Sequence, residues 1–177
     1  MSKETKNNIF EWVKTVAISV VFAFLIIQFI KPSLVMGESM YSTLEDQDFL
    51  IINRMSYKFG KIGHGDIIVF KSHIKNEDGS DKDLVKRVIG VEGDKIKIQD
   101  GEVYVNDEKL DEPYIHNEKT EGNTNTVVPK DCVFVLGDNR EISFDSRYKE
   151  VGFIKESDIE GKVVVRLYPF NKMGTIK

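Results

Sequence analysis

The chain has 177 residues, enough for one soluble domain of ordinary size with a short appendage, but not for two full domains. Its 41% hydrophobic and 31% charged residues are typical of a globular protein. A net charge of −4 provides no basic surface for a nucleic-acid backbone, so nucleic acid is excluded as a predicted partner. The single cysteine, Cys132, lies in the apolar run CVFVLG, so we expect no internal disulfide and a buried, unreactive thiol.

Residues 9–30, IFEWVKTVAISVVFAFLIIQFI, form an apolar segment of membrane-spanning length. As a helix, these 22 residues would rise about 33 Å, close to the hydrocarbon thickness of a bilayer. Between residues 16 and 29 the only polar side chains are Ser19 and Gln28, whereas Glu11 is typical of the headgroup level. The segment therefore predicts one N-terminal transmembrane helix that contacts membrane lipid.

Basic residues near the ends of this segment predict its orientation. Lys3, Lys6 and the α-amino group precede the segment, and Lys31 closes it. Because basic residues favour the cytoplasmic side, residues 1–8 are expected in the cytoplasm. Residues 31–177 are then expected outside the cell (plasma) membrane, as an extracytoplasmic domain behind a single-pass anchor.

A cleavable signal peptide and a buried core helix are the alternatives for the same segment. A signal peptide would have a shorter apolar region and a small-x-small site after it, and FIKPSLVMG does not provide one. A core helix would need a helical partner, but the rest of the chain is patterned as strands.

After residue 33 the apolar pattern changes to short runs rich in Val, Ile and Phe, which predict strands in FLIINR, DIIVFK, LVKRVIGV, KIKI, VYVN, CVFVLG and KVVVRLY. Asp100 and Gly101, between two of these runs, predict a tight hairpin that needs positive φ at both positions. Residues 60–66, 77–81 and 116–126 are predicted to be surface loops. We therefore expect a mainly β fold, an antiparallel sandwich or barrel, with residues 95–130 as a small hairpin and loop excursion.

Metal and cofactor chemistry is not indicated by the sequence. His64, His73 and His116 lack a ligand-like spacing, and one cysteine cannot complete a zinc site. The chain has no G-x-S-x-G elbow, P-loop or G-x-G-x-x-G motif. We therefore expect no cofactor.

Ser39 and Lys86 are candidates for acyl-transfer chemistry. Strand alternation in DLVKRVIGV places Lys86 beside Leu84 on one face and Arg87 on the other. If apolar surface covers the Lys86 face, desolvation lowers the lysine pKa, and the neutral amine can take the proton of a serine hydroxyl. The alternatives are a snorkelling surface cation at Lys86 and an ordinary turn hydroxyl at Ser39.

The segment GDNREISFDSR, residues 137–147, carries two Asp, one Asn, two Arg and two Ser directly after the apolar run CVFVL. Such a density of polar groups beside a core strand is costly unless the groups satisfy one another. We expect an internal network in which Asp145 pairs with Arg147 and a serine faces inward. A turn of solvated charges is the alternative, and the residues alone leave both open.

These segments, in this order behind an N-terminal membrane segment, resemble the bacterial type I signal peptidases. SMYSTL looks like the nucleophile box S-M-x-P-T-L of the family, GDIIVF like its strand box, and KRVIGVEGD like its lysine box. GDNREISFDSR matches G-D-N-R-x-x-S-x-D-S-R throughout, and YPF near the C-terminus is also similar. The resemblance covers nearly the whole chain, and the single anchor is similar to the form found in Gram-positive bacteria.

The resemblance implies a role for each matching residue. Ser39 would be the nucleophile, Lys86 the general base, and Ser143 the residue that hydrogen-bonds and orients the lysine amine. Asp145 and Arg147 would form a structural ion pair.

The resemblance also implies an oxyanion hole and substrate pockets. Gly37 stands where Gram-negative members carry a serine, so the backbone N–H of Ser39 would supply most of the oxyanion hole, with Gly37 permitting close approach to the substrate. Shallow pockets for small side chains would be formed by Val35, Met40, Leu44 and Leu84.

The implied activity is endoproteolytic removal of signal peptides from secretory preproteins after small-x-small sites of the Ala-x-Ala type. Two residues depart from the family pattern, because Ser42 and Glu92 each replace a usual proline. Three other functions are alternatives to signal-peptide removal. A self-cleaving repressor would carry a DNA-binding domain at its N-terminus, and a histidine-dependent relative would lack the lysine. A membrane-tethered, non-enzymatic β domain that binds peptides would tolerate loss of Ser39 and Lys86.

Overall fold

The computed structural model describes residues 3–76, 78–115 and 119–176. Within these residues one long helix precedes a domain built mainly of antiparallel strands. In chain order the elements are α1 Lys3–Phe29, β1 Ile30–Leu34, β2 Phe49–Asn53, α2 Ser56–Phe59, β3 Ile67–Lys75, β4 Asp81–Gly90, β5 Lys95–Gln99, β6 Glu102–Val105, β7 Glu108–Lys109, η1 Pro113–Ile115, β8 Thr124–Val127, β9 Cys132–Leu136, β10 Ile154–Lys155, η2 Glu156–Asp158, β11 Ile159–Tyr168, η3 Phe170–Lys172 and β12 Gly174–Thr175.

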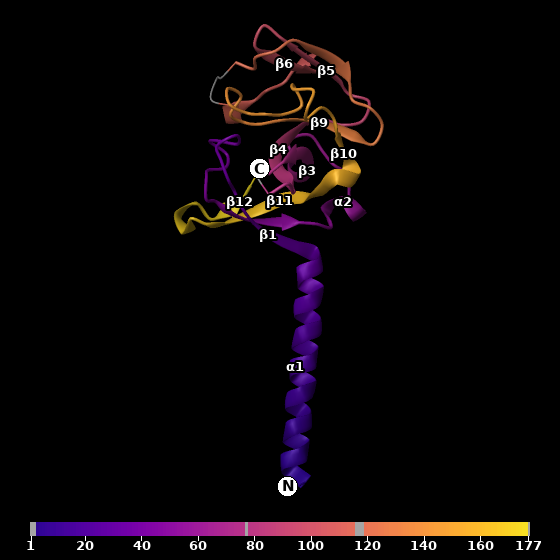
Figure 1. Ribbon diagram of the computed structural model, residues 1–177, viewed down its shortest axis with the longest axis vertical. Coiled ribbons are helices and arrows are strands. Elements are labelled where there is room, and N and C mark those ends of the chain that lie inside the picture. The colour runs from indigo at the N-terminus through magenta and orange to yellow at the C-terminus, as the bar shows by residue number, and fades with distance from the viewer. Residues whose placement is uncertain (1–2, 77, 116–118, 177) are drawn as a thin grey trace.

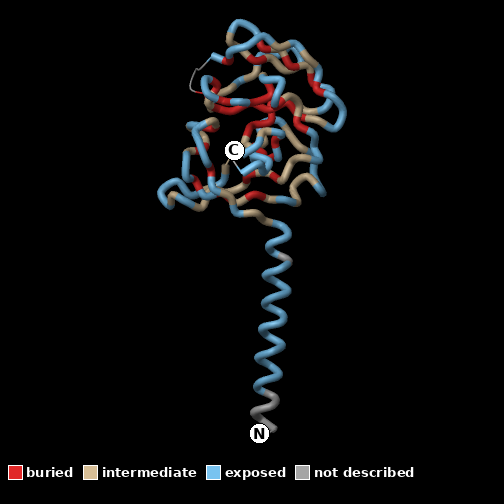
Figure 2. The backbone as a smooth tube through the Cα atoms, viewed as in Figure 1, coloured by how far each residue is buried: buried red, intermediate tan, exposed pale blue. Residues whose placement is uncertain are grey.

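Helix α1 projects from the β domain as a separate rod (Figure 1). Its side chains are exposed along its described length (Figure 2), including Trp12 at 73% and Phe10 at 67%. Residues Asn8–Phe29 are long and apolar enough to cross a bilayer. An apolar helix that packs against no protein surface needs lipid around it, because water would leave all of that surface hydrated.

The predicted boundary at Ile30 is wrong by one residue, because the helix ends at Phe29 and Ile30 begins β1. The carbonyl of Phe29 accepts a hydrogen bond from the backbone N–H of Arg54 at 2.9 Å, and Ile30 pairs with Asn53. The chain is therefore captured by the sheet as soon as it leaves the helix.

The larger sheet has the order β1-β2-β11-β3-β4-β9-β10, with β12 added to β11, and all described pairings in it are antiparallel. The seven apolar runs that predict strands are all strands in the structure, so the expected mainly β, antiparallel fold is confirmed. The short strands β1, β7, β10 and β12 carry no such signal in the sequence.

Strands β5, β6, β7 and β8 form a separate sheet of order β7-β6-β5-β8, at the end of the domain far from α1 (Figure 1). The hairpin at Asp100 and Gly101 is confirmed, because both residues have positive φ and Gln99 pairs with Glu102. The predicted loop 116–126 is wrong at its end, where β8 begins at Thr124. This strand pairs with β5 at the sheet edge, and its side chains are alternately half-buried and exposed, so it needs no apolar run. The first part of the predicted loop, residues 116–118, lies outside the described residues.

Three buried apolar clusters hold the domain together. The first contains residues of the segment between β1 and β2 and of strands β2, β3 and β11, and the second lies mainly on β3, β4 and β9. The third joins the two sheets and contains Ile89, Ile96, Ile98, Val103, Val128, Phe134 and Leu136. Cys132 packs at the edge of this third cluster and is half-buried rather than fully buried; burial raises the pKa of its thiol, which keeps it unreactive.

The exposed position of α1 predicts that the β domain folds without it. Deleting residues 1–29 removes no residue of the three buried clusters, so the thermal midpoint should change by no more than about 2–4 °C, the shift that 1 kcal/mol produces in a chain of this size. Circular dichroism melts of the full chain and of residues 30–177, both in the same detergent, measure this. A much larger fall in the midpoint would mean that α1 contributes to the folded core.

Candidate active site

Ser39 and Lys86 meet at the surface of the larger sheet. Ser39 lies in the turn between β1 and β2, and Lys86 lies on β4. The Nζ atom of Lys86 donates hydrogen bonds to Ser39 Oγ at 2.6 Å and to the carbonyl of Val85 at 3.0 Å. Lys86 is only 2% exposed, whereas Ser39 is half-buried and open on one side. The structure therefore brings together a buried amine and an accessible hydroxyl.

Burial lowers the pKa of Lys86 to about 8. The nearby carboxylates of Asp145 and Asp138 act in the opposite direction, but each is already paired with an arginine, Arg147 and Arg87 respectively. No ion pair to Lys86 is formed within the described part of the chain. Desolvation therefore dominates, and a large fraction of the amine is neutral near pH 8.

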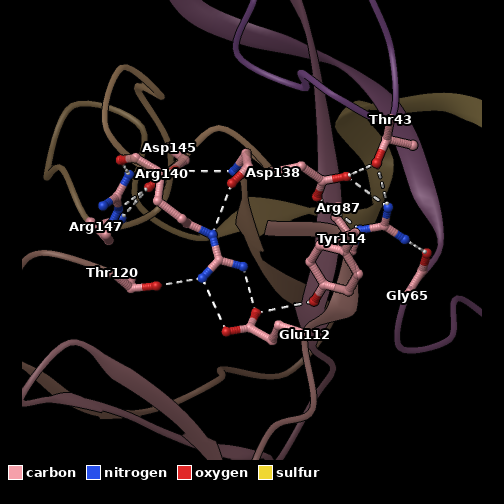
Figure 3. A network of polar contacts seen from close by, with 11 residues as sticks. Thr43, Gly65, Arg87, Glu112, Tyr114, Thr120, Asp138, Arg140, Asp145 and Arg147 are labelled. Carbon is pink, nitrogen blue, oxygen red and sulfur yellow. Dashed lines mark hydrogen bonds and ion pairs between the residues drawn. The ribbon is translucent and has the colours of Figure 1, made fainter. Parts of the chain in front are cut away.

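Arg87, the neighbour of Lys86, is equally buried but fully paired. Its guanidinium donates to Asp138 through Nε at 2.9 Å and through Nη2 at 2.7 Å, and to the carbonyl of Gly65 at 3.1 Å. Asp138 also accepts a hydrogen bond from Thr43 Oγ1 at 2.5 Å. Thr43 belongs to the same turn as Ser39, so this network ties the turn to β4 and to the segment after β9 (Figure 3).

The predicted pair of Asp145 and Arg147 is confirmed. Arg147 donates to Asp145 Oδ1 through Nε at 2.8 Å and to Oδ2 through Nη2 at 3.0 Å. The same guanidinium donates to the carbonyls of Arg140 and Ser143, and Asp145 accepts from the backbone N–H of Gly137. The charges of Asp138, Arg140, Asp145 and Arg147 are therefore all paired inside the protein, so residues 137–147 are not a turn of solvated charges.

Ser143 faces inward as expected, but its predicted hydrogen bond to the lysine amine is not formed. It is 2% exposed, and its Oγ has no partner among the described residues. Lys86 instead uses the carbonyl of Val85 as its second acceptor. A Cβ placed on Gly137 would lie 2.1 Å from Ser143 Oγ and 2.5 Å from the carbonyl oxygen of Ser39. Gly137 is therefore required for the close approach of the serine-bearing turn to the 137–147 loop.

Gly37 has φ of +95°, a conformation that favours glycine, and open space where a Cβ would stand. Its backbone N–H donates to Asp46 Oδ1 at 2.7 Å, so that N–H is already used within the turn. Gly37 can therefore leave room for a ligand, but it is not positioned to supply a free donor.

The expected pocket residues do not form one group. Val35, Met40 and Leu44 are buried together in the first apolar cluster, with exposures of 7%, 2% and 0%. Leu84 packs against the second cluster instead, and its neighbour Val85 packs against the first. Neighbouring residues on a strand face opposite ways, so Val85 is the β4 residue that accompanies Met40.

The region around the smaller sheet contributes contacts to the site that the sequence does not predict. Glu112, just before η1, forms a buried ion pair with Arg140 and receives a 3.1 Å hydrogen bond from Arg140 Nη1. Tyr114 donates to Glu112 at 3.0 Å, and its ring lies 3.9 Å from the guanidinium carbon of Arg87. Figure 3 shows this chain of contacts running from Arg140 through Glu112 and Tyr114 to Arg87. No local pattern predicts a contact between residues 28 apart in sequence on different elements.

The fold and site describe a β domain on a membrane-spanning helix with a serine beside a buried lysine. The family model "Signal peptidase, peptidase S26" matches residues 9–168. Signal peptidase IB of Staphylococcus aureus strain COL is 39% identical over 94% of this chain and 93% of its own. Signal peptidase I of Bacillus caldolyticus is 39% identical over 98% of each chain. A crystal structure of a signal peptidase I from Enterococcus faecalis V583 aligns at 32% identity and a TM-score of 0.48, over 58% of this chain and 96% of that one.

The chain belongs to the signal peptidase family, peptidase S26. It is a membrane peptidase that removes signal peptides from preproteins. The resemblance found in the sequence motifs is thereby confirmed.

Gly137→Ala tests the close packing around the site. The added methyl forces Ser143 and the Ser39 backbone apart, and overpacking of this kind costs about 1–3 kcal/mol. Because a displacement of about 1 Å can lower a rate by about 10²-fold, activity should fall far more than the amount of folded protein. Preprotein cleavage rates and thermal melts of the variant measure both effects. Gly174→Ala, where the added methyl meets open space, is the matched control. Wild-type activity in Gly137→Ala would contradict this account.

The lowered pKa of Lys86 predicts how stability depends on pH. Between about pH 8 and the ordinary value of 10.5 the unfolded chain binds more protons at this lysine than the folded chain, so folding becomes more favourable as pH rises. Relative to Lys86→Met, the wild-type free energy of unfolding should therefore rise by about 3 kcal/mol between pH 7 and pH 10.5. Urea titrations of both proteins at the two pH values measure this. A constant difference would mean that the lysine has its ordinary pKa in the folded protein.

Proposed function

We propose that the peptidase reaction uses Ser39 as nucleophile and Lys86 as general base. The observation that carries this proposal is the 2.6 Å contact between Ser39 Oγ and the Nζ atom of a lysine that is 2% exposed. When the amine is neutral, the same contact lets the hydroxyl donate its proton to the nitrogen lone pair. Ser39 Oγ then attacks the scissile carbonyl, and the lysine becomes an ammonium ion.

The proton held by Lys86 then completes the first half of the reaction. The ammonium gives it to the nitrogen of the departing mature protein, so the C–N bond breaks and the signal peptide stays esterified to Ser39. In the second half, Lys86 takes a proton from water, the resulting hydroxide attacks the ester, and the proton returns to Ser39 Oγ. The lysine is therefore neutral before each attack, which its depressed pKa permits.

The backbone N–H of Ser39 is proposed as the principal donor to the oxyanion. The N–H of Gly37 is occupied by Asp46, which supports assigning the role to Ser39. Ser143 is proposed to position Lys86: its buried, unpartnered Oγ can engage the amine once Nζ moves during proton transfer. The pair of Asp145 and Arg147 is proposed to hold the 137–147 loop in place.

The substrate is proposed to be cleaved after small-x-small sequences of the Ala-x-Ala type. An extended preprotein segment would bind beside the serine turn and β4 through its main chain. Val35, Met40 and Leu44 are almost fully buried, so they offer a shallow apolar floor rather than deep pockets, which supports selection of small side chains.

We further propose that the N-terminus of the chain is cytoplasmic and the β domain extracytoplasmic. The basic residues that precede the apolar segment support this orientation. Ser39 follows α1 after only β1 and a turn, so it lies near the membrane surface where the cleavage site of an inserted signal peptide emerges.

Cleavage of a preprotein with an Ala-x-Ala site, by full-length protein in detergent, tests the dyad. Ser39→Ala and Lys86→Ala should each lower kcat/KM by at least about 10³-fold, because each removes a group that acts in bond breaking. Wild-type kcat/KM should rise about tenfold per pH unit below a pKa of about 8 and level off above it, because only the neutral lysine is the base.

Ser80→Ala and Lys130→Ala serve as matched controls for the dyad variants, since both side chains are exposed and neither contacts the site. Wild-type cleavage by Ser39→Ala or Lys86→Ala, or an inflection near 10.5, would overturn the proposed dyad.

A further inference from the structure

A polar groove of about 600 Å³ lies where α1 joins the larger sheet. It is bounded by the end of α1, by Arg54 and α2, by β3 and by η2 with the start of β11. Its lining residues are Gln28, Arg54, Tyr57, Lys58, Lys71, Glu156, Ser157, Asp158, Ile159 and Glu160. None of these residues belongs to the site of Ser39 and Lys86. The peptidase mechanism therefore leaves this groove without a role.

Two chain segments that line the groove, residues 54–58 around α2 and residues 156–158 of η2, carry opposite charges that form no ion pair within the described residues. Arg54 and Lys58 form a basic side, and no hydrogen bond or ion pair of either side chain is found within the described residues. Glu156 and Asp158 form an acidic side, where Asp158 accepts only a 3.2 Å hydrogen bond from Ser157 and Glu156 has no described side-chain partner. Two cations and two anions therefore face the groove with their charges available.

The remaining charges of the groove are already committed. Glu160 is paired with Lys31 and lies 3.9 Å from the Nζ atom of Lys71, and the hydroxyl of Tyr57 donates to Asp66 at 3.1 Å. The groove thus presents a separated positive and negative site rather than a net charge of one sign. Such a lining complements a ligand that is itself zwitterionic.

The position of the groove limits what that ligand is. The backbone N–H of Arg54 is hydrogen-bonded to the carbonyl of Phe29, the last residue of α1, so Arg54 is fixed at the level where the apolar helix ends. Phe59, next to Lys58, is 85% exposed, and an exposed aromatic residue beside basic residues is typical of the headgroup region. With α1 in a bilayer, the groove opens among lipid headgroups.

We propose that this groove binds the headgroup of an amine-bearing zwitterionic phospholipid. The phosphate would contact Arg54 and Lys58, and the primary ammonium would contact Glu156 and Asp158. A primary ammonium offers three N–H donors to the two carboxylates, whereas a choline group offers none. An anionic glycerol headgroup would place no cation against the acidic side. The proposal rests on insertion of α1 in the membrane, but not on the Ser39 and Lys86 mechanism.

Lipid binding to the delipidated full-length chain in detergent tests the proposal, read by native mass spectrometry without any cleavage step. Phosphatidylethanolamine, phosphatidylcholine and phosphatidylglycerol with identical acyl chains are the probes. The wild type should bind the ethanolamine lipid about tenfold more tightly than the other two, the effect of one charge-assisted hydrogen bond. Equal affinity for all three lipids, or preference for the glycerol lipid, would overturn the proposal.

Paired substitutions locate the binding to the groove. Arg54→Gln with Lys58→Gln should weaken binding of the ethanolamine lipid about tenfold or more, because the phosphate loses its cations. Glu156→Gln with Asp158→Asn should remove the preference for ethanolamine over choline while leaving phosphate binding. Lys130→Gln with Glu108→Gln, exposed residues near the smaller sheet, is the matched control. An equal loss in the control pair, or no change in the groove variants, would contradict the assignment.

These substitutions affect exposed or half-buried side chains outside the apolar clusters, so the variants are expected to fold, which circular dichroism verifies. Cleavage of a preprotein by the same variants separates the two proposals. Loss of lipid selectivity with intact cleavage identifies a lipid site independent of catalysis. Wild-type cleavage by Ser39→Ala, with ethanolamine selectivity retained, would refute only the proposed dyad.

Discussion

The site depends on a buried lysine that pairs with no carboxylate in the described part of the chain. An ammonium ion at a position with 2% exposure loses most of its hydration, and burial lowers the pKa of Lys86 to about 8. A carboxylate in contact with Nζ would restore the charged form, and two carboxylates, Asp138 and Asp145, are close enough to act on it. Arg87 pairs with Asp138, and Arg147 pairs with Asp145. The two arginines thereby leave the lowered pKa of Lys86 in place, as its proposed role as a base requires, and the burial of this lysine lowers the stability of the folded chain at neutral pH.

The polar network around the site also explains why a peptidase site on the larger sheet needs the smaller sheet. Arg140 is completely buried as a side chain, and its charge is balanced by Glu112 from the segment between β7 and η1. Removing one partner of such a pair leaves an uncompensated buried charge, which costs about 3–5 kcal/mol. Tyr114 continues the contact to Arg87, one residue from Lys86. The third apolar cluster holds the two sheets together, so this polar contact is formed between parts that are already packed.

The sequence predicted the features that are encoded locally. Apolar runs predicted seven strands, the Asp100 and Gly101 pair predicted its hairpin, and the density of charge in residues 137–147 predicted an internally paired loop. The sequence could not predict contacts made across elements, such as Glu112 with Arg140. The edge strand β8 carries no apolar signal because its inward-facing residues, Thr124 and Thr126, are only half-buried. Strand alternation predicts that Leu84 and Val85 face opposite ways but not which apolar cluster each one joins; in the structure Val85 packs against the first cluster and Leu84 against the second.

The connection from helix to sheet places the site at a fixed height above the membrane. No flexible linker follows α1, because Ile30 already pairs with Asn53 and the helix end is bonded to Arg54. Lys31, the next residue, binds Asp83 at 3.0 Å and also pairs with Glu160, so the start of β1 is tied to β4 and β11 at once. Asp83 lies on the strand that carries Lys86. If the domain is oriented as proposed, we expect a substrate held in the same bilayer to meet the site at a defined distance from the membrane surface. The rigidity of this junction would then contribute to the choice of the scissile bond, together with the side chains beside it.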